Sequence, residues 1–181
     1  MGHDSTVIPN ESDLVRRARR GDSAALGRLF GMHAKAIHAL AYRLTGDRAA
    51  AEDITQDTFL KMLRFMGGFH GSRPLRPWLK RVASNAAIDR LRRDWRYAAE
   101  WEDALQTDHP PAADAGLEAT GLLRRLAPPA RTVVWLHVME GWTHPEIAAR
   151  FGRTPSWSKS LLARSLAALR AHLEEENLEH P

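Results

Sequence analysis

Apolar residues recur at intervals of three and four along most of this chain, a spacing typical of one face of an α-helix. The clearest run consists of Leu26, Leu29, Phe30, His33, Ile37, Leu40 and Leu44. Asp22, which follows Gly21, is a favourable N-cap because its carboxylate accepts hydrogen bonds from the free N–H groups of a first helical turn. The pattern predicts one long amphipathic helix between Asp22 and Gly46.

Two more helices are predicted in the N-terminal half. Gly46 and Asp47 repeat the stop-and-cap signal, and a periodic stretch then runs to about Met66, just before a Gly-Gly pair. After the loop GGFHGSRP, a third helix is expected to bury one face and to turn a basic face outward. Its expected buried residues are Leu75, Trp78, Leu79, Val82 and Ala86, and its expected outward residues are Arg76, Lys80, Ser84 and Asn85.

Periodicity is lost over residues 97–116, which gather two prolines and five acidic side chains. We expect this stretch to be a flexible linker. The expected division of the chain is a first domain at 12–97, a linker at 98–116 and a second domain at 117–175.

Helical periodicity resumes in the second domain. It runs over residues 117–126, stops at Pro128 and Pro129, and restarts through Val133 toward Gly141. No stretch of useful length alternates apolar and polar residues in the manner of a β-strand. The predicted fold class is therefore all-α, with two small helical domains joined by a flexible linker.

The segment THPEIAARFGRTPSWSKSLL, residues 143–162, admits two chemical interpretations. His144 and Glu146 match the H-x-E signature of a zinc hydrolase, but that signature needs a downstream P-C-x-x-C, and the chain has no cysteine. Thr143 and Glu146 also form an S/T-x-x-E capping box, with Pro145 in the first helical turn. The capping box accounts for Glu146 without catalysis.

The same segment predicts a helix-turn-helix. Ile147 and Phe151 supply an apolar face, and Gly152 ends the first helix. Thr154 caps the next helix and Pro155 begins it after a short turn. In such a motif the second helix enters the major groove and its first turns meet base edges. The residues expected near DNA are Ser156, Trp157, Lys159 and Ser160, while Leu162, Leu166 and Leu169 are expected to hold the helix to its domain.

Composition narrows the function classes. Of the 181 residues, 44% are hydrophobic and 27% are charged, which is ordinary for a folded, soluble chain. The lack of cysteine fits a reducing compartment and excludes disulfides, thiolate nucleophiles and Cys-containing metal sites. No apolar window is long enough to span a bilayer, and the N-terminus lacks the pattern of a secretory signal. We therefore expect a cytoplasmic protein without metal, cofactor or membrane insertion.

Charge points to a polyanionic partner. The net charge is +4 and the isoelectric point is near 9.9. Between Arg73 and Arg96 eight basic residues stand against two acidic ones, a local excess of +6. This excess lies on the third predicted helix, in a different domain from the helix-turn-helix.

Taken in order, four stretches resemble the extracytoplasmic-function sigma factors, the smallest promoter-specificity subunits of bacterial RNA polymerase. They are DLVRRARRGDSAALGRLF, GDRAAAEDITQDTFLKM, LRPWLKRVASNAAIDRLRR and LLRRLAPPARTVVWLHVMEGWTHPEIAARFG. The resemblance covers about residues 12–96 and 117–173, and it implies region 2 and region 4 of the sigma-70 family. It further implies a non-enzymatic initiation factor that binds core polymerase and recognises promoter DNA through both domains.

The resemblance also implies roles for single residues. Asp53, Gln56 and Asp57 match the D-x-x-Q-[DE] positions that bind the β′ clamp helices of the polymerase, whereas region 4 would meet the β flap. Phe69 matches the loop residue that helps to hold a flipped base of the minus-ten element, and Asn85 matches an A-x-N on the next helix. The residues that would meet backbone phosphates are Arg73, Arg76, Lys80 and Arg81. Each role has a simpler alternative. The acidic residues of the D-x-x-Q-[DE] motif could be a solvated helix face, Phe69 could anchor its loop, and Asn85 could be an amide on the helix surface.

The recognition helix departs from the family's common G-T-V-K-S-R-L. The corresponding residues here are Ser156, Trp157, Ser158, Lys159, Ser160, Leu161 and Leu162, and Arg164 follows. Trp157 replaces an exposed Thr, Ser158 a buried Val, and Leu161 a base-contacting Arg. Loss of that arginine is expected to remove about 1–3 kcal/mol of discrimination at one base pair. Trp157 and Leu161 could contact thymine methyls or a protein partner; alternatively, Trp157 packs against the preceding helix.

Two other classes of function compete with the sigma factor. A helix-turn-helix regulator with an N-terminal sensor or dimerisation domain would bind duplex DNA without polymerase, but it leaves the basic excess of the first domain unexplained. An enzyme would need a base, metal cluster or phosphate loop beside Asp53 and Asp57, and the sequence offers none. The expected partners are core RNA polymerase, promoter DNA and an anti-sigma factor.

Overall fold

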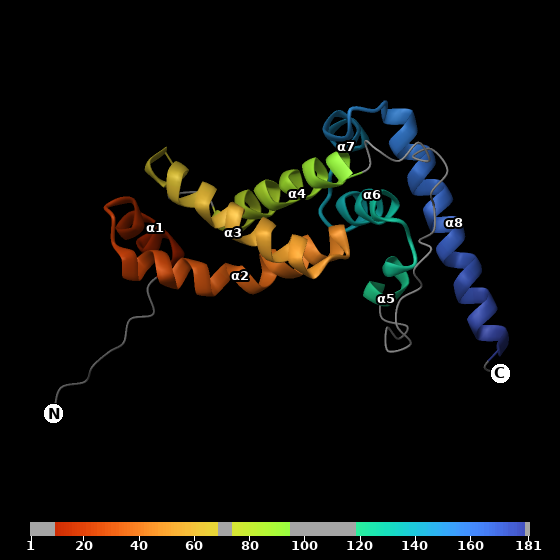
Figure 1. Ribbon diagram of the computed structural model, residues 1–181, viewed down its shortest axis with the longest axis horizontal. Helices are drawn as coiled ribbons and strands as arrows, with labels where there is room; N and C mark the ends of the chain where they lie inside the picture. Colours follow the sequence, from red (N-terminus) through yellow and green to blue (C-terminus); the bar gives the residue numbers. More distant parts are fainter. Residues whose placement is uncertain (1–9, 69–73, 95–118, 180–181) are drawn as a thin grey trace.

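The computed structural model describes residues 10–68, 74–94 and 119–179, and every regular element in these ranges is a helix. The predicted all-α fold class is therefore confirmed. Helices α1 to α4 form an N-terminal unit, and helices α5 to α8 form a C-terminal unit at one end of it (Figure 1). The expected linker at 98–116 lies outside the described residues.

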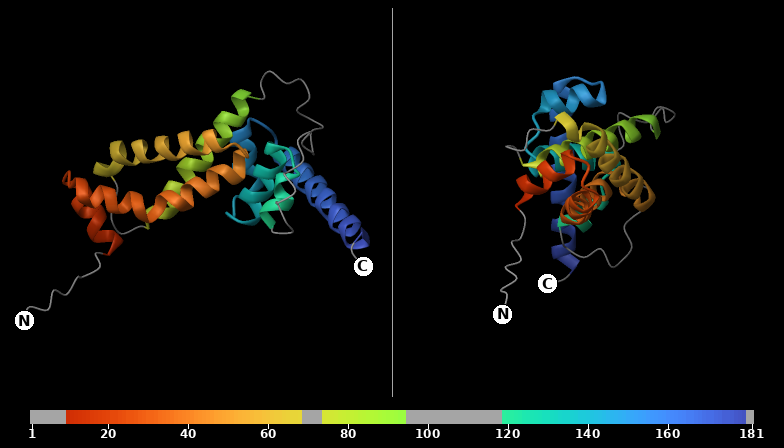
Figure 2. Two further views of the ribbon diagram at one scale, coloured as in Figure 1. Left: turned by 60° about the horizontal axis from the view of Figure 1, so that its bottom comes forward. Right: turned by 90° about the vertical axis from the view of Figure 1, so that its left-hand side faces the viewer.

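The predicted helices are all present, and α1 is an additional one. The N-terminal unit consists of α1 (Glu11–Arg19), α2 (Ser23–Thr45), α3 (Arg48–Phe65), a 3-10 turn (Met66–Gly68) and α4 (Leu75–Asp94). The C-terminal unit consists of α5 (Ala119–Arg124), α6 (Pro128–Val138), α7 (His144–Phe151) and α8 (Pro155–Glu179). Helices α2, α3 and α4 lie side by side, and α1 packs against α2 (Figure 2).

The ends of α2 and α3 follow the predicted capping signals. Asp22 accepts a hydrogen bond from the backbone N–H of Ala25 at 3.0 Å, and Asp47 accepts one from that of Ala49 at 2.9 Å. Gly46 ends α2 in the left-handed region with φ of 73°, a conformation that glycine adopts without the steric cost of a Cβ. These caps set the sharp turn between α2 and α3.

The core of the N-terminal unit lies between α2 and its three neighbours. Leu29, Ile37 and Leu44 of α2 are completely buried. Each such side chain contributes about 1.5–3 kcal/mol through removal of its apolar surface from water. His33, on the same stripe, is also buried, and its Nε2 lies 3.0 Å from Oε1 of Glu11. The same Glu11 oxygen accepts the backbone N–H of Leu75 at 3.2 Å, so one carboxylate joins α1, α2 and α4.

The buried face of α4 differs from the predicted one. Ser84, expected to point outward, is 1% exposed, while Trp78, Val82 and Ala86 are only half-buried. The buried residues are Leu75, Leu79, Ala83, Ser84, Ala87, Ile88 and Leu91. Helix α4 contacts α2, α3, α6 and α7, and its small buried residues allow neighbouring helices to approach closely. Alanine and serine give little hydrophobic signal, which is why the sequence pattern misplaced this face.

The C-terminal unit contains the predicted helix-turn-helix in α7 and α8. Thr143 and Glu146 form the complete capping box of α7, and Gly152 ends the helix with φ of 66°. The hydroxyl of Thr154 accepts the backbone N–H of Trp157 at 3.2 Å and thereby caps α8. Along α8 the buried residues include Ser158, Leu161 and Ser165, whereas Leu166 is 43% exposed. The expectation that Leu166 holds α8 to its domain was wrong, although Leu162 and Leu169 do pack against the core.

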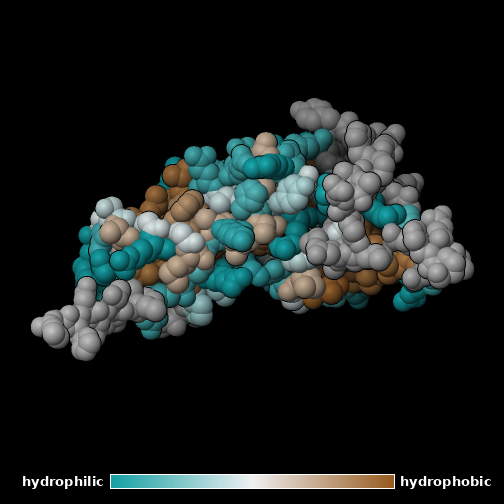
Figure 3. Space-filling model, turned by 90° about the horizontal axis from the view of Figure 1, so that it is seen from below, coloured by the Kyte–Doolittle hydropathy of each residue, from teal (hydrophilic) through white to brown (hydrophobic). Residues whose placement is uncertain are grey.

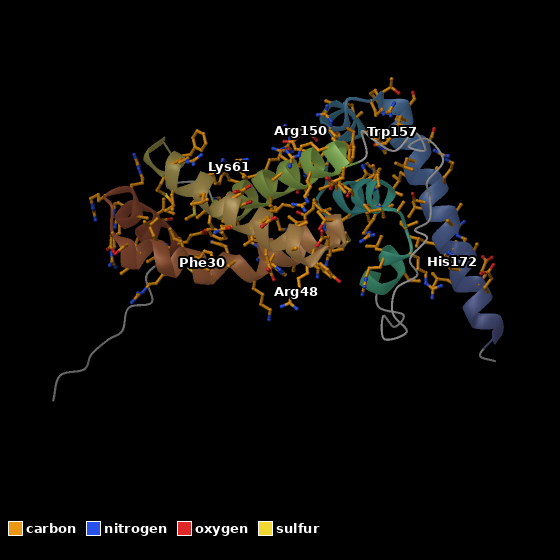
Figure 4. All side chains as sticks on the ribbon, in the orientation of Figure 1. Phe30, Arg48, Lys61, Arg150, Trp157 and His172 are labelled. Atoms are coloured by element: carbon orange, nitrogen blue, oxygen red, sulfur yellow. The ribbon has the colours of Figure 1, made fainter. Side chains whose placement is uncertain are left out.

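The two units contact each other directly. Helix α2 packs against α6 and α5, and α4 packs against α7 and α6. The hydroxyl of Thr132, which is completely buried, donates a hydrogen bond to the carbonyl oxygen of Leu44 at 3.1 Å. Arg92 Nη1 donates to the carbonyl oxygen of Arg150 at 3.2 Å, where the end of α4 meets α7 (Figure 4). The surface seen from below in Figure 3 is hydrophilic along its middle, with hydrophobic side chains gathered toward either end.

Candidate nucleic-acid and protein interfaces

One face of α3 carries the three predicted polymerase-binding residues. Asp53, Gln56 and Asp57 are all exposed, and their spacing of three and four positions places them on the same side of the helix. Asp53 Oδ2 accepts a hydrogen bond from Arg90 Nη1 of α4 at 3.2 Å, yet the Asp53 side chain stays 66% exposed. The structure therefore brings all three residues together on an accessible acidic face.

An apolar extension of this face was missed in the sequence. Leu60 and Leu63 continue the same spacing from Asp53 and Gln56, and they are 44% and 47% exposed. Phe65, at the end of α3, is 64% exposed. The signal was present, because Leu60 lies two helical turns after Asp53. Leucines in a helix usually face the core, but Leu60 and Leu63 lie on the outward side.

A cavity of about 340 Å³ opens where α3 ends and α4 begins. Its lining is mainly apolar and consists of Met62, Phe65, Met66, Gly68, Leu75 and Trp78. Trp78, predicted as core, is thus a half-buried wall of this cavity. Two predicted DNA-binding residues, Phe69 and Arg73, belong to the loop that joins these helices and lie outside the described residues.

Asn85 does not lie at this cavity. It follows Leu75 by ten residues on α4, a rise of about 15 Å along the helix. Its side chain is half-buried, and its Oδ1 is buried without a hydrogen-bond partner among the residues that the structure describes. A buried amide oxygen without a donor is unfavourable, so Asn85 is more constrained than the surface amide considered from sequence.

The basic face of α4 is occupied by the C-terminal unit. Lys80 Nζ lies 2.8 Å from both carboxylate oxygens of Glu140. Arg81 Nη2 lies 2.8 Å from Oε1 of Glu146, and the Arg81 guanidinium carbon is 4.0 Å from the centroid of the Trp142 indole. Arg76 of the same helix is exposed. Two of the predicted phosphate-binding residues therefore hold carboxylates that follow α6 or begin α7.

Glu146 serves both the capping box and this contact. Its Oε2 accepts the backbone N–H of Thr143 at 2.8 Å, while its Oε1 receives Arg81. The hydrogen bond from the Thr143 backbone and then the one from Arg81 lower the pKa of Glu146 to about 2. The carboxylate is therefore ionised at neutral pH.

The predicted DNA-binding residues of α8 divide into an outward and an inward group. Ser156, Lys159, Ser160 and Arg164 are exposed. Trp157 is half-buried, and its ring centroid lies 5.3 Å from that of Phe151 in α7, at the corner seen in Figure 4. Leu161 is only 6% exposed. Trp157 thus packs against the preceding helix, as the alternative interpretation held, and Leu161 is a residue of the hydrophobic core.

Ser158, which stands where the family has a buried Val, has a partner inside the helix-turn-helix. It is completely buried, and its Oγ lies 3.0 Å from His144 Nδ1. The His144 ring stacks on that of His137 with centroids 4.2 Å apart. Burial, together with His137 and Lys159, lowers the pKa of His144. His144 therefore orders the motif, and within the described residues no group of three or more metal-ligating side chains converges.

The match to known proteins follows this division into two units. Residues 29–97 match the family Sigma-70 region 2, and residues 117–169 match Sigma-70, region 4. The chain is 33% identical over 171 residues to the RNA polymerase sigma factor CarQ of Myxococcus xanthus, covering 91% of this chain and 98% of CarQ. It belongs to the extracytoplasmic-function sigma factors of the sigma-70 family. We call the N-terminal unit region 2 and the C-terminal unit region 4 below.

Further relatives support the same assignment. The ECF RNA polymerase sigma factor SigL of Mycobacterium tuberculosis is 31% identical, with 89% of this chain and 96% of SigL covered. The solved structure of CnrH in complex with the cytosolic domain of CnrY covers 91% of this chain and 97% of CnrH, with 26% identity and a TM-score of 0.53. The sigma factor RpoE of Bartonella quintana shares the fold at 23% identity, with 82% of this chain and 96% of RpoE covered and a TM-score of 0.51.

The sigma factor family defines the function. This sigma factor binds core RNA polymerase and directs promoter-specific transcription initiation. Sigma factors are not a class of enzyme. The alternative of a helix-turn-helix regulator acting without polymerase gains no support, since both sigma regions match. None of the described helices combines the length and the apolar character that crossing a bilayer requires.

Proposed function

We propose that region 2, residues 12–97, binds the β′ clamp helices of core polymerase through Asp53, Gln56 and Asp57 of α3. The observation that carries this proposal is the accessible acidic face of α3, which continues into Leu60 and Leu63. A charged patch beside apolar side chains suits a protein partner, because the charges orient the encounter and the leucines supply buried area. Region 4, residues 117–175, contacts the β flap, and residues 98–116 link the two regions.

Region 2 also captures and melts the minus-ten element. The cavity of about 340 Å³ between α3 and α4 flanks the loop that carries Phe69. Its volume falls in the range of small-molecule pockets, roughly 300–1,000 Å³, so an extruded base fits. Extruding a base costs a few kcal/mol, which stacking and edge contacts offset. Backbone phosphates are neutralised by Arg73, Arg76, Lys80 and Arg81. Asn85 contacts the DNA further along α4. No catalytic residue is needed, since binding energy drives strand opening.

Region 4 reads the minus-thirty-five element through the outward residues of α8. Ser156 and Ser160 meet base edges, while Lys159 and Arg164 supply positive charge beside the phosphates. Trp157 packs on Phe151 and thereby supports this surface of α8, and it does not project into the DNA major groove. Because Leu161 faces the core, the family's arginine contact has no substitute at that position.

Promoter binding requires that region 4 leaves the basic face of α4. Lys80 and Arg81 cannot hold the carboxylates of region 4 and backbone phosphates at the same time. The Arg81–Glu146 pair is partly exposed on both sides, and such pairs contribute only about 0–1 kcal/mol each. Contacts with polymerase through α3 and the β flap are therefore able to separate the two regions in the cytoplasm, where transcription takes place.

An anti-sigma factor is the remaining proposed partner. The structure of CnrH, 97% of which is matched by this chain, was solved in complex with the cytosolic domain of CnrY. A protein that holds this sigma factor in the same way would compete with polymerase for it. A pull-down from native cells that recovers polymerase and no other protein would count against this partner.

The test of the proposed function is run-off transcription on fragmented host DNA. Sigma-free core polymerase is used with and without this protein, and the 5′ ends are sequenced. New start sites that share an upstream motif are expected, and the motif shows whether α8 still reads a minus-thirty-five element. The proposal fails if no new starts appear and the protein does not coelute with core polymerase on a sizing column.

A further inference from the structure

Three arginines line a cavity of about 200 Å³ at the junction between region 2 and region 4. The lining residues are Ala39, Tyr42, Arg43, Leu123, Arg124 and Arg131. Arg43 belongs to α2 of region 2, whereas Arg124 and Arg131 belong to α5 and α6 of region 4. Positive charge from both regions therefore converges on one small space.

Each arginine is oriented by a group that carries no negative charge. The Arg43 guanidinium carbon lies 4.8 Å from the centroid of the Trp135 ring, and that of Arg124 lies 6.0 Å from the centroid of Tyr42. Arg131 Nη2 donates a hydrogen bond to the carbonyl oxygen of Leu126 at 3.0 Å. Among the described residues, none of the three arginines has an ion pair with a carboxylate.

The positive charge of Arg131 is almost fully removed from water. Arg131 is 5% exposed, and its Nε is buried without a hydrogen-bond partner in the part of the chain that the structure describes. The Nε of Arg43 is also buried without a hydrogen-bond partner among the described residues. Burial, and then repulsion by Arg124, lowers the pKa of Arg131 to about 10, so the side chain is still charged at neutral pH. A buried cation without a counter-ion is strongly unfavourable unless an anion joins it.

We propose that this cavity, which we call the arginine pocket, binds a small multivalent oxyanion of the phosphate class. Guanidinium groups match phosphate oxygens with paired N–H donors, and Nε together with one Nη forms such a pair. The volume holds several water molecules of about 30 Å³ each but is below the roughly 300 Å³ at which whole-molecule pockets begin. The pocket therefore accepts orthophosphate, or the terminal phosphates of a nucleotide whose base stays outside.

Binding in the arginine pocket joins the two regions. The anion bridges Arg43 of α2 and the arginines of α5 and α6, and it removes the repulsion between them. It stabilises the arrangement in which region 4 covers the basic face of α4, since a ligand that binds one conformation shifts the population toward it. The level of phosphate compounds then tunes how readily this sigma factor opens.

The test uses the free 181-residue chain without polymerase or DNA, so its outcome does not depend on promoter recognition. Titration calorimetry measures binding of orthophosphate, pyrophosphate and ATP, with sodium acetate and sodium chloride at matched ionic strength as comparisons. Thermal unfolding is followed under the same conditions. Saturable one-to-one binding of phosphate or pyrophosphate and a Tm increase of several degrees are expected, because a ligand that binds only the folded state stabilises it. Binding of ATP would identify nucleotides as the source of the bound phosphate group. If orthophosphate or pyrophosphate binds and ATP does not, the source is free phosphate.

Arg43→Gln and Arg124→Gln are the diagnostic variants, because both side chains are half-buried and their replacement leaves the buried Arg131 in place. Each is expected to weaken binding by about tenfold or more, the effect of losing a charge-assisted hydrogen bond. The matched control is Arg48→Gln, whose side chain is 83% exposed and pairs only with Glu52 among the described residues. Equal Tm shifts in all four proteins, an equal effect of acetate, or no saturable binding at millimolar concentrations would each overturn the proposal.

Discussion

Region 2 and region 4 present their predicted DNA-binding side chains in opposite ways. In region 2 the basic side chains Lys80 and Arg81 of α4 are paired with carboxylates of region 4. In region 4 the outward residues Ser156, Lys159 and Ser160 of α8 are exposed. In the free protein the predicted DNA-binding residues of region 4 are therefore accessible, whereas Lys80 and Arg81 of region 2 are already paired. The predicted polymerase-binding face of α3 is exposed, so under the proposed function polymerase can bind before the basic face of α4 is released.

The largest expected effect is a loss of folding stability when Leu161 of α8 is replaced. It tests whether this position contacts a base or belongs to the core. Leu161→Arg reinstates the family's residue, but Leu161 is 6% exposed. Burying a guanidinium there should lower the free energy of unfolding by about 3 kcal/mol. Urea unfolding followed by circular dichroism measures the change. The control Ala163→Arg, at an exposed position of α8, should change stability little. A Leu161→Arg variant of unchanged stability with sharper promoter discrimination would show that residue 161 faces DNA.

The next effect separates polymerase binding from DNA binding in region 2. Asp57→Lys places a repulsive charge in the exposed face of α3 and should weaken affinity for core polymerase by about 2 kcal/mol, roughly 30-fold. Fluorescence anisotropy of labelled protein with core polymerase gives the dissociation constant. Glu52→Lys changes the same charge on a side chain of α3 that is 60% exposed but outside the predicted interface, and it should have little effect. Equal losses in both variants would mean that only net charge matters.

A smaller effect tests the contact that distinguishes the two regions. Glu140→Lys turns the Lys80 pair into a repulsion and should favour separation by roughly 1–2 kcal/mol, which raises the affinity of free protein for single-stranded DNA by about 5- to 30-fold. Because the chain has no cysteine, dyes on cysteines introduced at Arg28 and Arg170 report the separation by energy transfer. Glu175→Lys, on a side chain of α8 that is 74% exposed, is the control. Unchanged energy transfer in Glu140→Lys would contradict the occluding contact.

The smallest effect is a pH dependence localised to Glu146. Its folded pKa of about 2 lies below the ordinary value of 4.5, so the charged carboxylate stabilises the folded state at all pH values above about 4.5. That contribution is lost as the pH falls from about 4.5 toward 2. The difference in Tm between the native chain and Glu146→Gln, which retains a capping-box side chain, should be constant near neutrality and shrink across this window. A difference independent of pH would exclude an electrostatic origin.

Two geometric features of the candidate interfaces could be predicted from the sequence. The α3 face was predicted because Asp53, Gln56 and Asp57 lie within one helix, where spacing alone decides which side chains share a side. The helix-turn-helix was predicted because its caps, Thr143, Glu146 and Gly152, act on backbone groups a few residues away. Leu161 was misassigned because inward and outward positions near the start of α8 depend on where α6 and α7 contact it.

Sequence alone therefore determined the helices and their caps, because these depend on interactions over one or two helical turns. It also determined the family, through the order of its motifs, and the residues that carry charge. Only the tertiary structure decided that Ser84 is buried, that Trp157 packs on Phe151 and that Lys80 holds Glu140. It also brought Arg43, Arg124 and Arg131 to one cavity from three helices. Such contacts join residues far apart in the chain, and they depend on how whole helices pack, which no local pattern of apolar and polar residues encodes.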